Sequence, residues 1–404
     1  MTYKLAWRNL WRNQRRSLIT MASIFFAVLL AIVTRSLQEG TYNQMIDNMV
    51  SFYSGYVQVH QRGYWEEQTL DHSLAEDPTL VEQVQAHPQV EHLIPRLESF
   101  ALASYRDETA PAAVVGIDPD LERQLTHLPD KLVAGQYLDD SGGALLAEKL
   151  AEKMSLGVGD TVVLLGQGYH GVMAAGKYAV KGILSFGSPD LNQRMLYLPI
   201  AEAQLMYGAD GRLTSYVLAL KDPQRTPQVV ADLQGQLDTA QYEVMDWRSM
   251  MPELVQTIEG DRAGGVVMVW VLYLIIGFGI FGTVLMMTTE RKFEFGVLTA
   301  IGMKRGKLSL TVILESIIIA MLGVLAGALA ALPITWYFQE NPIYMGDEMA
   351  EMYADYGMDA VLPMVVDPAL FLDQGITILI ITLIISLYPL LKISRLKPVE
   401  AMKQ

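Results

Sequence analysis

The segment of this chain that looks most like a catalytic motif is rich in glycine. Residues 171–177 read GVMAAGK and match the first seven positions of the phosphate-binding P-loop. The eighth position is Tyr178, so the small hydroxyl that would hold magnesium is missing. The residues that follow read as a strand, whereas a phosphate grip needs the N-terminus of a helix there. We therefore predict a glycine-rich hairpin and no nucleotide site.

Histidines are the next candidates, because they serve as general bases and as zinc ligands. The sequence has six of them: His60, His72, His87, His92, His127 and His170. No two stand at the i, i+4 spacing of a zinc-binding helix, and no G-x-S-x-G nucleophile motif occurs. The chain has no cysteine, which excludes thiol catalysis, disulfides and cysteine-ligated metals. We predict solvated surface histidines, no catalytic site and no metal site.

One acidic residue lies in an apolar environment. Glu315 is the single charged residue between positions 308 and 338. A carboxylate inside a membrane is costly and is therefore a functional candidate. Two kinds of interpretation stay open: a proton relay, or a structural role, either as an anchor for the helix end or in a pair with a basic residue of the loop at 290–307. Further along the same run, Gly323 and Gly327 form a G-x-x-x-G step, which predicts close helix packing or dimerisation.

The overall composition indicates which elements hold these residues. Hydrophobic residues make up 51% of the 404 residues and charged residues only 18%, against about 25% charged in an ordinary soluble protein. This apolar content excludes a disordered chain. The formal net charge of −14 argues against nucleic acid as a partner, since a nucleic-acid binder needs a basic face.

Four apolar runs are long enough for helices that cross a bilayer, which takes about 20 residues each. They predict spans at 18–40, 263–289, 308–338 and 375–391. A buried core helix is the alternative for a single run, but the second and third are longer than a globular core needs. A signal peptide is the alternative for the first run, but no small-residue cleavage motif follows it.

The positions of lysine and arginine predict the orientation. Residues 1–17, 290–307 and 392–404 together hold 14 of the 30 basic residues and only three acidic ones. Because segments rich in lysine and arginine stay in the cytoplasm, we predict a multi-pass protein of the bacterial inner membrane with both termini inside. Residues 1–17 would form a cytoplasmic amphipathic helix and 392–404 a cytoplasmic tail. The segments 41–262 and 339–374 would lie outside.

The large outer segment, 41–262, predicts a mixed α/β domain. Strand patterns occur around 57–59 and at 100–105, 112–117, 161–165, 178–184, 195–198 and 215–220. Helical patterns occur at 121–128, 145–154 and 226–237, and stalk helices are expected at 41–49 and 250–262. The predicted fold class is therefore a membrane protein with four transmembrane α-helices and a large α/β extracytoplasmic domain between spans one and two.

The cytoplasmic segments carry the most specific pattern. Residues 290–305 read ERKFEFGVLTAIGMKR, which resembles the loop between spans two and three of FtsX-type ABC permeases. Further segments that resemble this family lie at 6–16, 115–119, 144–160 and 394–402. The resemblance runs the whole length of the chain. Within this MacB-type (type VII) group it is strongest to the LolC and LolE lipoprotein-releasing branch.

The resemblance implies a permease subunit of an ATP-driven ABC transporter, without enzyme activity or cofactor of its own. ATP and magnesium would bind to a separate cytoplasmic ATPase dimer. Residues 290–307 would form the coupling helix that contacts this ATPase, and the alternative is an interfacial helix on anionic lipid. The apolar face of this helix would consist of Phe293, Phe295, Val297, Leu298 and Ile301. The residues implied in coupling are Glu290, Arg291, Phe293, Glu294, Phe295, Gly296, Leu298, Ala300, Gly302, Lys304 and Arg305.

The resemblance also implies a second permease subunit, alike or different, the lipid bilayer, and a possible periplasmic carrier or adaptor as partners. The expected function is release or export of lipoproteins or other amphipathic cargo from the inner membrane. Residues 36–42 lack the glycine-rich exit of the lipoprotein releasers. An antibiotic or peptide exporter therefore stays open, as do a non-transporting mechanotransmitter that regulates a periplasmic partner and a membrane-anchored sensor or ecto-enzyme.

Overall fold

The computed structural model describes residues 2–12, 14–139, 142–346 and 361–395. The chain divides into two compact units, each described by itself below. The helical unit comprises residues 1–42, 257–344 and 361–404, and the α/β unit comprises 43–256 and 345–360. Most of the predicted tail, from residue 396, and the middle of the predicted loop at 339–374 lie outside the described residues.

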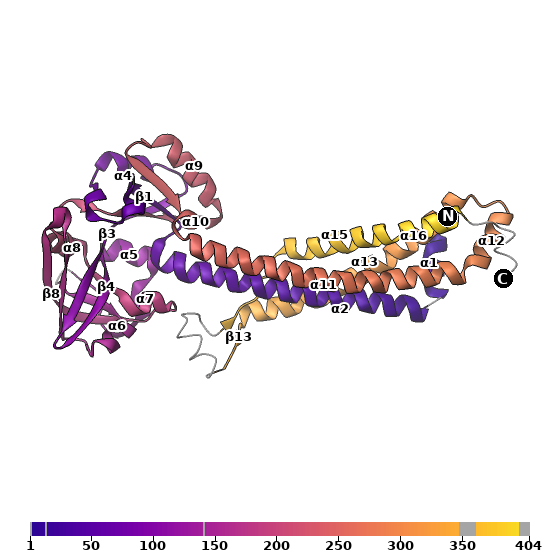
Figure 1. Cartoon of the computed structure of the whole chain (residues 1–404), viewed down its shortest axis with the longest axis horizontal. Helices are drawn as coiled ribbons and strands as arrows, with labels where there is room; N and C mark the ends of the chain where they lie inside the picture. Colours follow the sequence, from indigo (N-terminus) through magenta and orange to yellow (C-terminus); the bar gives the residue numbers. More distant parts are fainter. Residues whose placement is uncertain (1, 13, 140–141, 347–360, 396–404) are drawn as a thin grey trace. The chain divides into compact units, whose positions relative to one another are not determined.

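In the part of the chain that the structure describes, four helices are long and apolar enough to cross a membrane, so the chain is a multi-pass membrane protein. They are formed by α2 (Gln14–Ile46), α11 (Pro252–Glu290), α13 (Arg305–Glu340), and α15 (Pro368–Ile385) continued by α16 (Leu387–Ser394). Two shorter helices, α1 (Thr2–Arg12) and α12 (Lys292–Ala300), complete the helical unit (Figure 1). Each long helix extends beyond its predicted apolar run, because polar residues continue the helix past the apolar stretch.

The four long helices share one apolar core. Val28 of α2, Ile276 of α11, Val324 of α13 and Ile378 of α15 are all buried in it. A hydrogen bond of 2.7 Å between the Thr20 and Thr283 hydroxyls adds a polar contact between α2 and α11. The bundle buries a stripe of each helix and leaves the opposite apolar faces exposed, as a membrane protein does in lipid.

The described ends of the outer connection pack against the first long helix. Residues Ile343–Tyr344 (β13) and Val361–Leu362 (β14) form a two-stranded hairpin. The Ser36 hydroxyl of α2 donates a hydrogen bond of 2.6 Å to the Val365 carbonyl. At Gly40, one turn on, the Pro363 carbonyl occupies the place of a side chain, so glycine is required for this approach.

The α/β unit is built on a sheet with ten strands among its described residues. They are β1 (Val57–Gln61), β3 (Val90–Tyr105), β4 (Glu108–Ile117), β5 (Leu132–Gly135), β6 (Ala144–Ala147), β7 (Thr161–Gln167), β8 (Met173–Leu184), β9 (Met195–Pro199), β11 (Ser215–Leu220) and β12 (Tyr242–Asp246). A two-stranded sheet joins β2 (Leu74–Ala75) to β10 (Arg212–Leu213). The helices are η1 (Asp47–Ser54), α3 (Tyr64–Glu67), α4 (Pro78–Gln85), α5 (Pro119–Thr126), α6 (Glu148–Lys153), α7 (Pro189–Arg194), α8 (Ile200–Tyr207), α9 (Thr226–Gln236) and α10 (Trp247–Met250), with short 3-10 turns at Leu70–His72, Leu128–Lys131, Tyr169–Gly171 and Pro223–Arg225.

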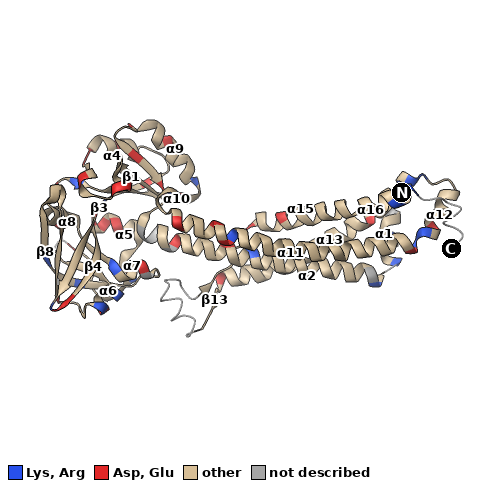
Figure 2. Cartoon of the chain, in the orientation of Figure 1, with Lys and Arg blue, Asp and Glu red and all other residues tan. Residues whose placement is uncertain are grey.

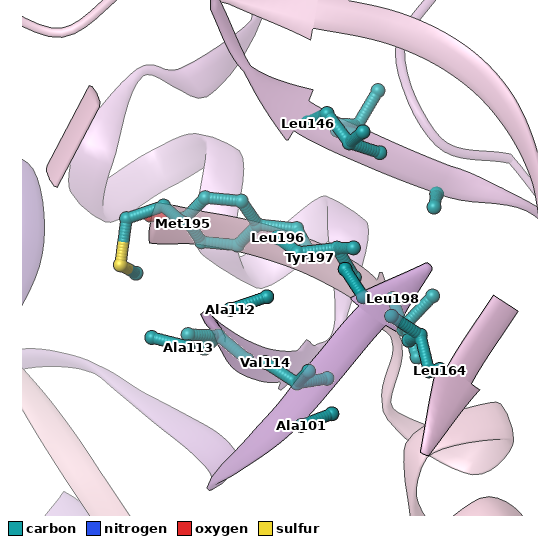
Figure 3. Packing of buried hydrophobic residues seen from close by; sticks show 14 of the residues in the cluster. Ala101, Ala112, Ala113, Val114, Leu146, Leu164, Met195, Leu196, Tyr197 and Leu198 are labelled. Atoms are coloured by element: carbon teal, nitrogen blue, oxygen red, sulfur yellow. The ribbon is translucent and has the colours of Figure 1, made fainter. Parts of the chain in front are cut away.

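Six of these strands close into a ring. The pairings run from β3 to β4, β9, β6, β8 and β7, and β7 pairs with β3 again. Side chains from several of these strands, including Leu146, Leu164 and Leu198, gather in the resulting core (Figure 3). The ring encloses the larger apolar core of the unit.

A second, smaller core lies on the other part of the sheet. Strands β12, β1, β11 and the start of β3 pair in antiparallel order. Leu80 and Val84 of α4, and Val229 and Leu233 of α9, are buried in the apolar cluster that covers these strands. The unit therefore has one half built as a closed ring and one half built as a sheet covered by helices.

The structure confirms the predicted α/β character and the strand positions, and it corrects one helix. The predicted helix at 145–154 is wrong at its start, because 144–147 form strand β6 and the helix α6 begins at Glu148. Leu145 and Leu146 are both fully buried, which a strand buried on both faces achieves and an amphipathic helix does not. The P-loop-like segment lies at the turn and start of the β7–β8 hairpin, as predicted.

Candidate functional site

The short helix α12 lies between α11 and α13 and holds most of the predicted coupling residues. Its Glu294 receives two hydrogen bonds of 2.7 Å from Arg12 at the end of α1. The same carboxylate accepts a hydrogen bond of 3.1 Å from Arg291. These hydrogen bonds connect α12 to α1. Figure 2 shows charged residues at this end of the helical unit and a largely uncharged middle.

Arg291 connects this surface cluster to the inside of the bundle. Its Nη1 donates a hydrogen bond of 2.9 Å to Glu315 of α13, which is 1% exposed. Arg291 is itself buried, and its guanidinium lies 5.2 Å from the centre of the Phe295 ring. Of the two interpretations left open for Glu315, the structure shows the pairing with a basic residue of the preceding loop.

The electrostatics of the cluster keep the Glu294 carboxylate charged. Burial alone would raise the pKa of Glu294, but the hydrogen bonds and positive charges of Arg12 and Arg291 outweigh burial and lower that pKa below its usual value. Glu294 is thus ionised at neutral pH and lies between two cationic side chains, Arg12 and Arg291. Opposite charges at this distance stabilise one another.

The apolar residues of α12 divide between two directions. Phe295 is 1% exposed and shares a cluster with Leu308 and Val312 of α13 and Ile393 of α16. By contrast, Phe293 is 53% exposed and Ile301, just after the helix, is 76% exposed. The sequence suggested one common apolar face, but residues two apart point in nearly opposite directions on a helix. Phe295 therefore anchors α12, and Phe293 belongs to its outer surface.

The remaining predicted coupling residues also divide in this way. Gly296 is buried and Leu298 is partly buried against the same cluster. The exposed set consists of Glu290, Ala300, Gly302, Lys304 and Arg305. Gly302 has φ +98°, a conformation that favours glycine and turns the chain from α12 into α13. Arg305 donates a hydrogen bond of 2.6 Å to the Ser394 carbonyl at the end of α16.

The two glycines of the G-x-x-x-G step pack within the chain. A Cβ atom on Gly323 would lie 2.8 Å from the Cβ of Ile24, and one on Gly327 would lie 2.8 Å from the Phe25 carbonyl oxygen. Both distances are shorter than any normal carbon contact. The step thus allows α13 to approach α2 closely, which is the packing alternative of the prediction.

Two of the six histidines contradict the expectation of a solvated surface. His60 is 1% exposed and His87 is 8% exposed. His60 lies on β1, where its Nδ1 is 3.0 Å from the Thr214 carbonyl, and its ring stacks on Tyr64. Burial lowers the pKa of His60 to about 4. No metal-binding group of histidine and acidic residues occurs among the described residues.

Sequence reasoning missed the contact between Arg12 and Glu294, which lie 282 positions apart. The sequence predicted an amphipathic helix at residues 1–17 and gave no partner for Arg12. A signal was present, because Glu290 and Glu294 are the only acids in the basic segments before residue 395, and Arg291 and Lys292 lie between them. Isolated acids in a basic segment favour pairing with their neighbours.

Comparison with known proteins gives this arrangement a family. The FtsX-like permease C-terminal family model matches residues 266–398, and the MacB-like periplasmic core domain model matches residues 17–236. The chain is 26% identical to the lipoprotein-releasing system transmembrane protein LolC of Xylella fastidiosa strain Temecula1, over 97% of this chain and 95% of that protein. It is 21% identical to the corresponding LolE protein of Haemophilus influenzae, over 98% of each.

A third relative is the macrolide export ATP-binding/permease protein MacB of Chromobacterium violaceum. It is 22% identical over 83% of this chain and 53% of its own length. The first matched region covers most of α2 and the α/β unit as far as the end of α9, and the second covers most of α11 and the long helices that follow it. The chain therefore belongs to the FtsX-like permeases with a MacB-like periplasmic core domain, the ABC transporter permeases of the LolC and MacB type.

Proposed function

We propose that the chain works with a separate cytoplasmic ABC ATPase dimer and that α12 is the contact surface. The observation that carries this proposal is the division of α12 between anchored and exposed side chains. Phe295 and Arg291 hold the helix to the bundle, whereas Phe293 and Ile301 present apolar surface outward. Exposed apolar side chains with a basic rim suit a groove on a soluble protein.

The charge distribution supports a cytoplasmic position for α12. The surface around it holds Arg12, Lys304 and Arg305, and the positive-inside rule places such segments in the cytoplasm. Trp7 and Trp11 of α1 are 40% and 48% exposed and lie edge to face, 6.0 Å apart. Exposed tryptophans are typical of the membrane interface. In this topology both termini are cytoplasmic and the α/β unit lies outside.

In this proposal the charged side chains of Arg12, Glu294, Arg291 and Glu315 transmit force from α12 to α1 and α13. A movement of α12 acts on α13 through Arg291 and Glu315, and on α1 through Glu294 and Arg12. The close contact of Gly323 and Gly327 with α2 couples α13 to the helix that leads into the α/β unit. In the proposed cycle, closure of the ATPase dimer shifts α12 and the long helices carry the motion outward. ATP and magnesium bind to the ATPase, and this chain contributes no catalytic group.

The proposed cargo is a lipoprotein or another amphipathic molecule that leaves the inner membrane. Two relatives are named as lipoprotein-releasing proteins and one as a macrolide exporter, so the class of cargo is amphipathic in each case. A second permease subunit completes the membrane part, and a periplasmic carrier or adaptor receives the cargo. A non-transporting mechanotransmitter that regulates a periplasmic partner would use the same path of force.

The test is co-purification of the ATPase with the full chain in detergent. We expect the double variant Phe293→Asp, Ile301→Asp to lose the ATPase, because charges replace the apolar contact surface. The matched control is Val133→Asp, which is 54% exposed on β5 and should retain the ATPase. Retention of the ATPase by the double variant would contradict the proposed surface. ATP-dependent release of cargo from proteoliposomes then separates an exporter from a mechanotransmitter.

A further inference from the structure

The first helix, α1, has one side fixed to the helix bundle. Ala6 and Leu10 are 0% and 1% exposed. Leu10 packs in one cluster with Met287 of α11 and Ile319 of α13. The Ser17 hydroxyl donates a hydrogen bond of 3.2 Å to the Leu10 carbonyl, which holds the end of α1 against the start of α2. Buried contacts therefore fix the position of α1, and the opposite side of the helix is exposed.

This exposed side carries a row of aromatic rings. Tyr3, Trp7 and Trp11 are spaced by four residues, so they lie along one side of the helix. Tyr3 is 60% exposed, and the two tryptophans are 40% and 48% exposed. Rings that combine an apolar body with a polar N–H or O–H group favour the level of the lipid headgroups. The row therefore suits the boundary between lipid and water.

Two arginines close to this row in the sequence have no counterion. Arg8 and Arg15 are exposed, and neither forms an ion pair within the described part of the chain. The sequence has no acidic residue before Glu39, so no nearby carboxylate is available to them. Arg12 differs from both, because its guanidinium is held by Glu294 of α12. Two positive charges are therefore available to an external partner.

An anionic phospholipid satisfies the rings and the arginines together. Guanidinium groups bind phosphate oxygens through paired hydrogen bonds. In a zwitterionic lipid the headgroup cation cancels the phosphate charge, whereas an anionic lipid keeps a net negative charge. A negative membrane surface strengthens binding about fivefold for each arginine close to it. An acidic soluble protein would satisfy the arginines but would remove the tryptophans from the headgroup layer.

We propose that the exposed side of α1, together with Arg8 and Arg15, binds the headgroups of anionic phospholipids in the cytoplasmic leaflet. The proposal rests on the cytoplasmic position of α1 proposed above. It adds a ligand that is distinct from the cargo and from the ATPase. Because Arg12 of the same helix holds Glu294, the lipid-binding helix is joined directly to α12.

The experiment uses the full chain without the ATPase, in nanodiscs of equimolar phosphatidylglycerol and phosphatidylcholine with identical acyl chains. Native mass spectrometry counts the lipids that stay bound after release from the nanodisc. We expect phosphatidylglycerol to exceed phosphatidylcholine about fivefold or more. The double variant Arg8→Gln, Arg15→Gln should lose most of this preference. The variant Arg8→Lys, Arg15→Lys should keep most of it, and Trp7→Leu, Trp11→Leu should retain fewer lipids of both kinds.

The matched control is Arg123→Gln, Arg225→Gln, which removes two arginines of the α/β unit whose side chains are each 54% exposed. It should keep the preference, and far-ultraviolet circular dichroism shows whether each variant is folded. Equal binding of both lipids by the unmodified chain, an unchanged preference in the folded glutamine variant, or an equal loss in the control would overturn the proposal. Co-purification of the ATPase is measured separately, so either proposal can fail while the other holds.

Discussion

Both units of this permease bury an arginine against a glutamate, but the two pairs join different things. Arg96 and Glu122 are 1% and 0% exposed and connect β3 to α5 inside the α/β unit. Arg291 and Glu315 are 9% and 1% exposed and connect the end of α11 to α13. From Arg291 the charges continue to Glu294 and to Arg12, whose side chain is 52% exposed.

The difference shows that a buried ion pair is not by itself a sign of function. The cost of removing charges from water offsets most of the attraction within such a pair. In the helical unit the charges lead from the interior through Glu294 to Arg12 at the surface. In the α/β unit Arg96 also contacts Glu98, whose side chain is 23% exposed, at 3.6 Å.

The largest loss of stability is expected from breaking the Arg96–Glu122 ion pair of the α/β unit. Arg96→Met leaves the Glu122 carboxylate buried without its cation, and the loss of stability should be about 3–5 kcal/mol. The double variant Arg96→Met, Glu122→Leu should recover most of that loss. Denaturant unfolding of the full chain, followed by tryptophan fluorescence, measures both. A single variant as stable as the double variant would show that the pair is not energetically coupled.

A smaller loss is expected for the corresponding change in the helical unit. Arg291→Met leaves Glu315 buried, but the variant keeps the contact of Glu294 with Arg12, so we expect a loss of about 3 kcal/mol. The charge-reversed double variant Arg291→Glu, Glu315→Arg should restore part of the thermal stability. Stimulation of the ATPase should fall in Arg291→Met by more than the change in thermal stability explains. If stimulation is unchanged, the network does not transmit force.

The α/β unit also buries the titratable side chain of His60, which forms no ion pair among the described residues. The free energy of unfolding should therefore depend on pH. The folded chain lowers the pKa of His60 from 6.5 to about 4 by burial, so the neutral ring stabilises the fold. This stability is complete above pH 6.5 and falls as the pH drops toward 4, because the unfolded chain binds the proton first. The total loss of unfolding free energy should be about 3 kcal/mol. His60→Gln should flatten this pH dependence of unfolding, whereas His92→Gln should keep it.

The smallest effect is expected at the exposed end of the network. Arg12→Ala removes an ion pair whose two side chains are 52% and 41% exposed. Exposed pairs contribute at most about 1 kcal/mol, and salt screens them. We expect a shift in thermal stability that disappears at high ionic strength. A loss equal to that of Arg291→Met would mean that the surface and buried parts of the network act as one unit.

Much of the fold was predictable because it rests on simple patterns. Long apolar runs predicted the four helices, and alternating residues predicted strands such as β1 and the end of β3. The helix predicted at 145–154 failed at its start because two buried leucines fit a strand and a helix equally well over so short a stretch. The closed ring of six strands was not predictable, since it depends on pairings such as β3 with β7 that join distant segments.

The candidate site was predictable in position but not in its geometry. The sequence pointed to residues 290–305 and to Glu315, yet it placed Phe293 and Phe295 on one face. It also gave no partner for Glu294, because Arg12 comes from the opposite end of the chain.

The closed ring of strands limits how other proteins can attach to the α/β unit. Among the strands of its main sheet, only β12 and β5 have a single neighbour, and each has at most five residues. Extended segments of a partner thus find little free backbone to pair with. Recognition by this unit is therefore expected to depend on turns, helix surfaces and side chains.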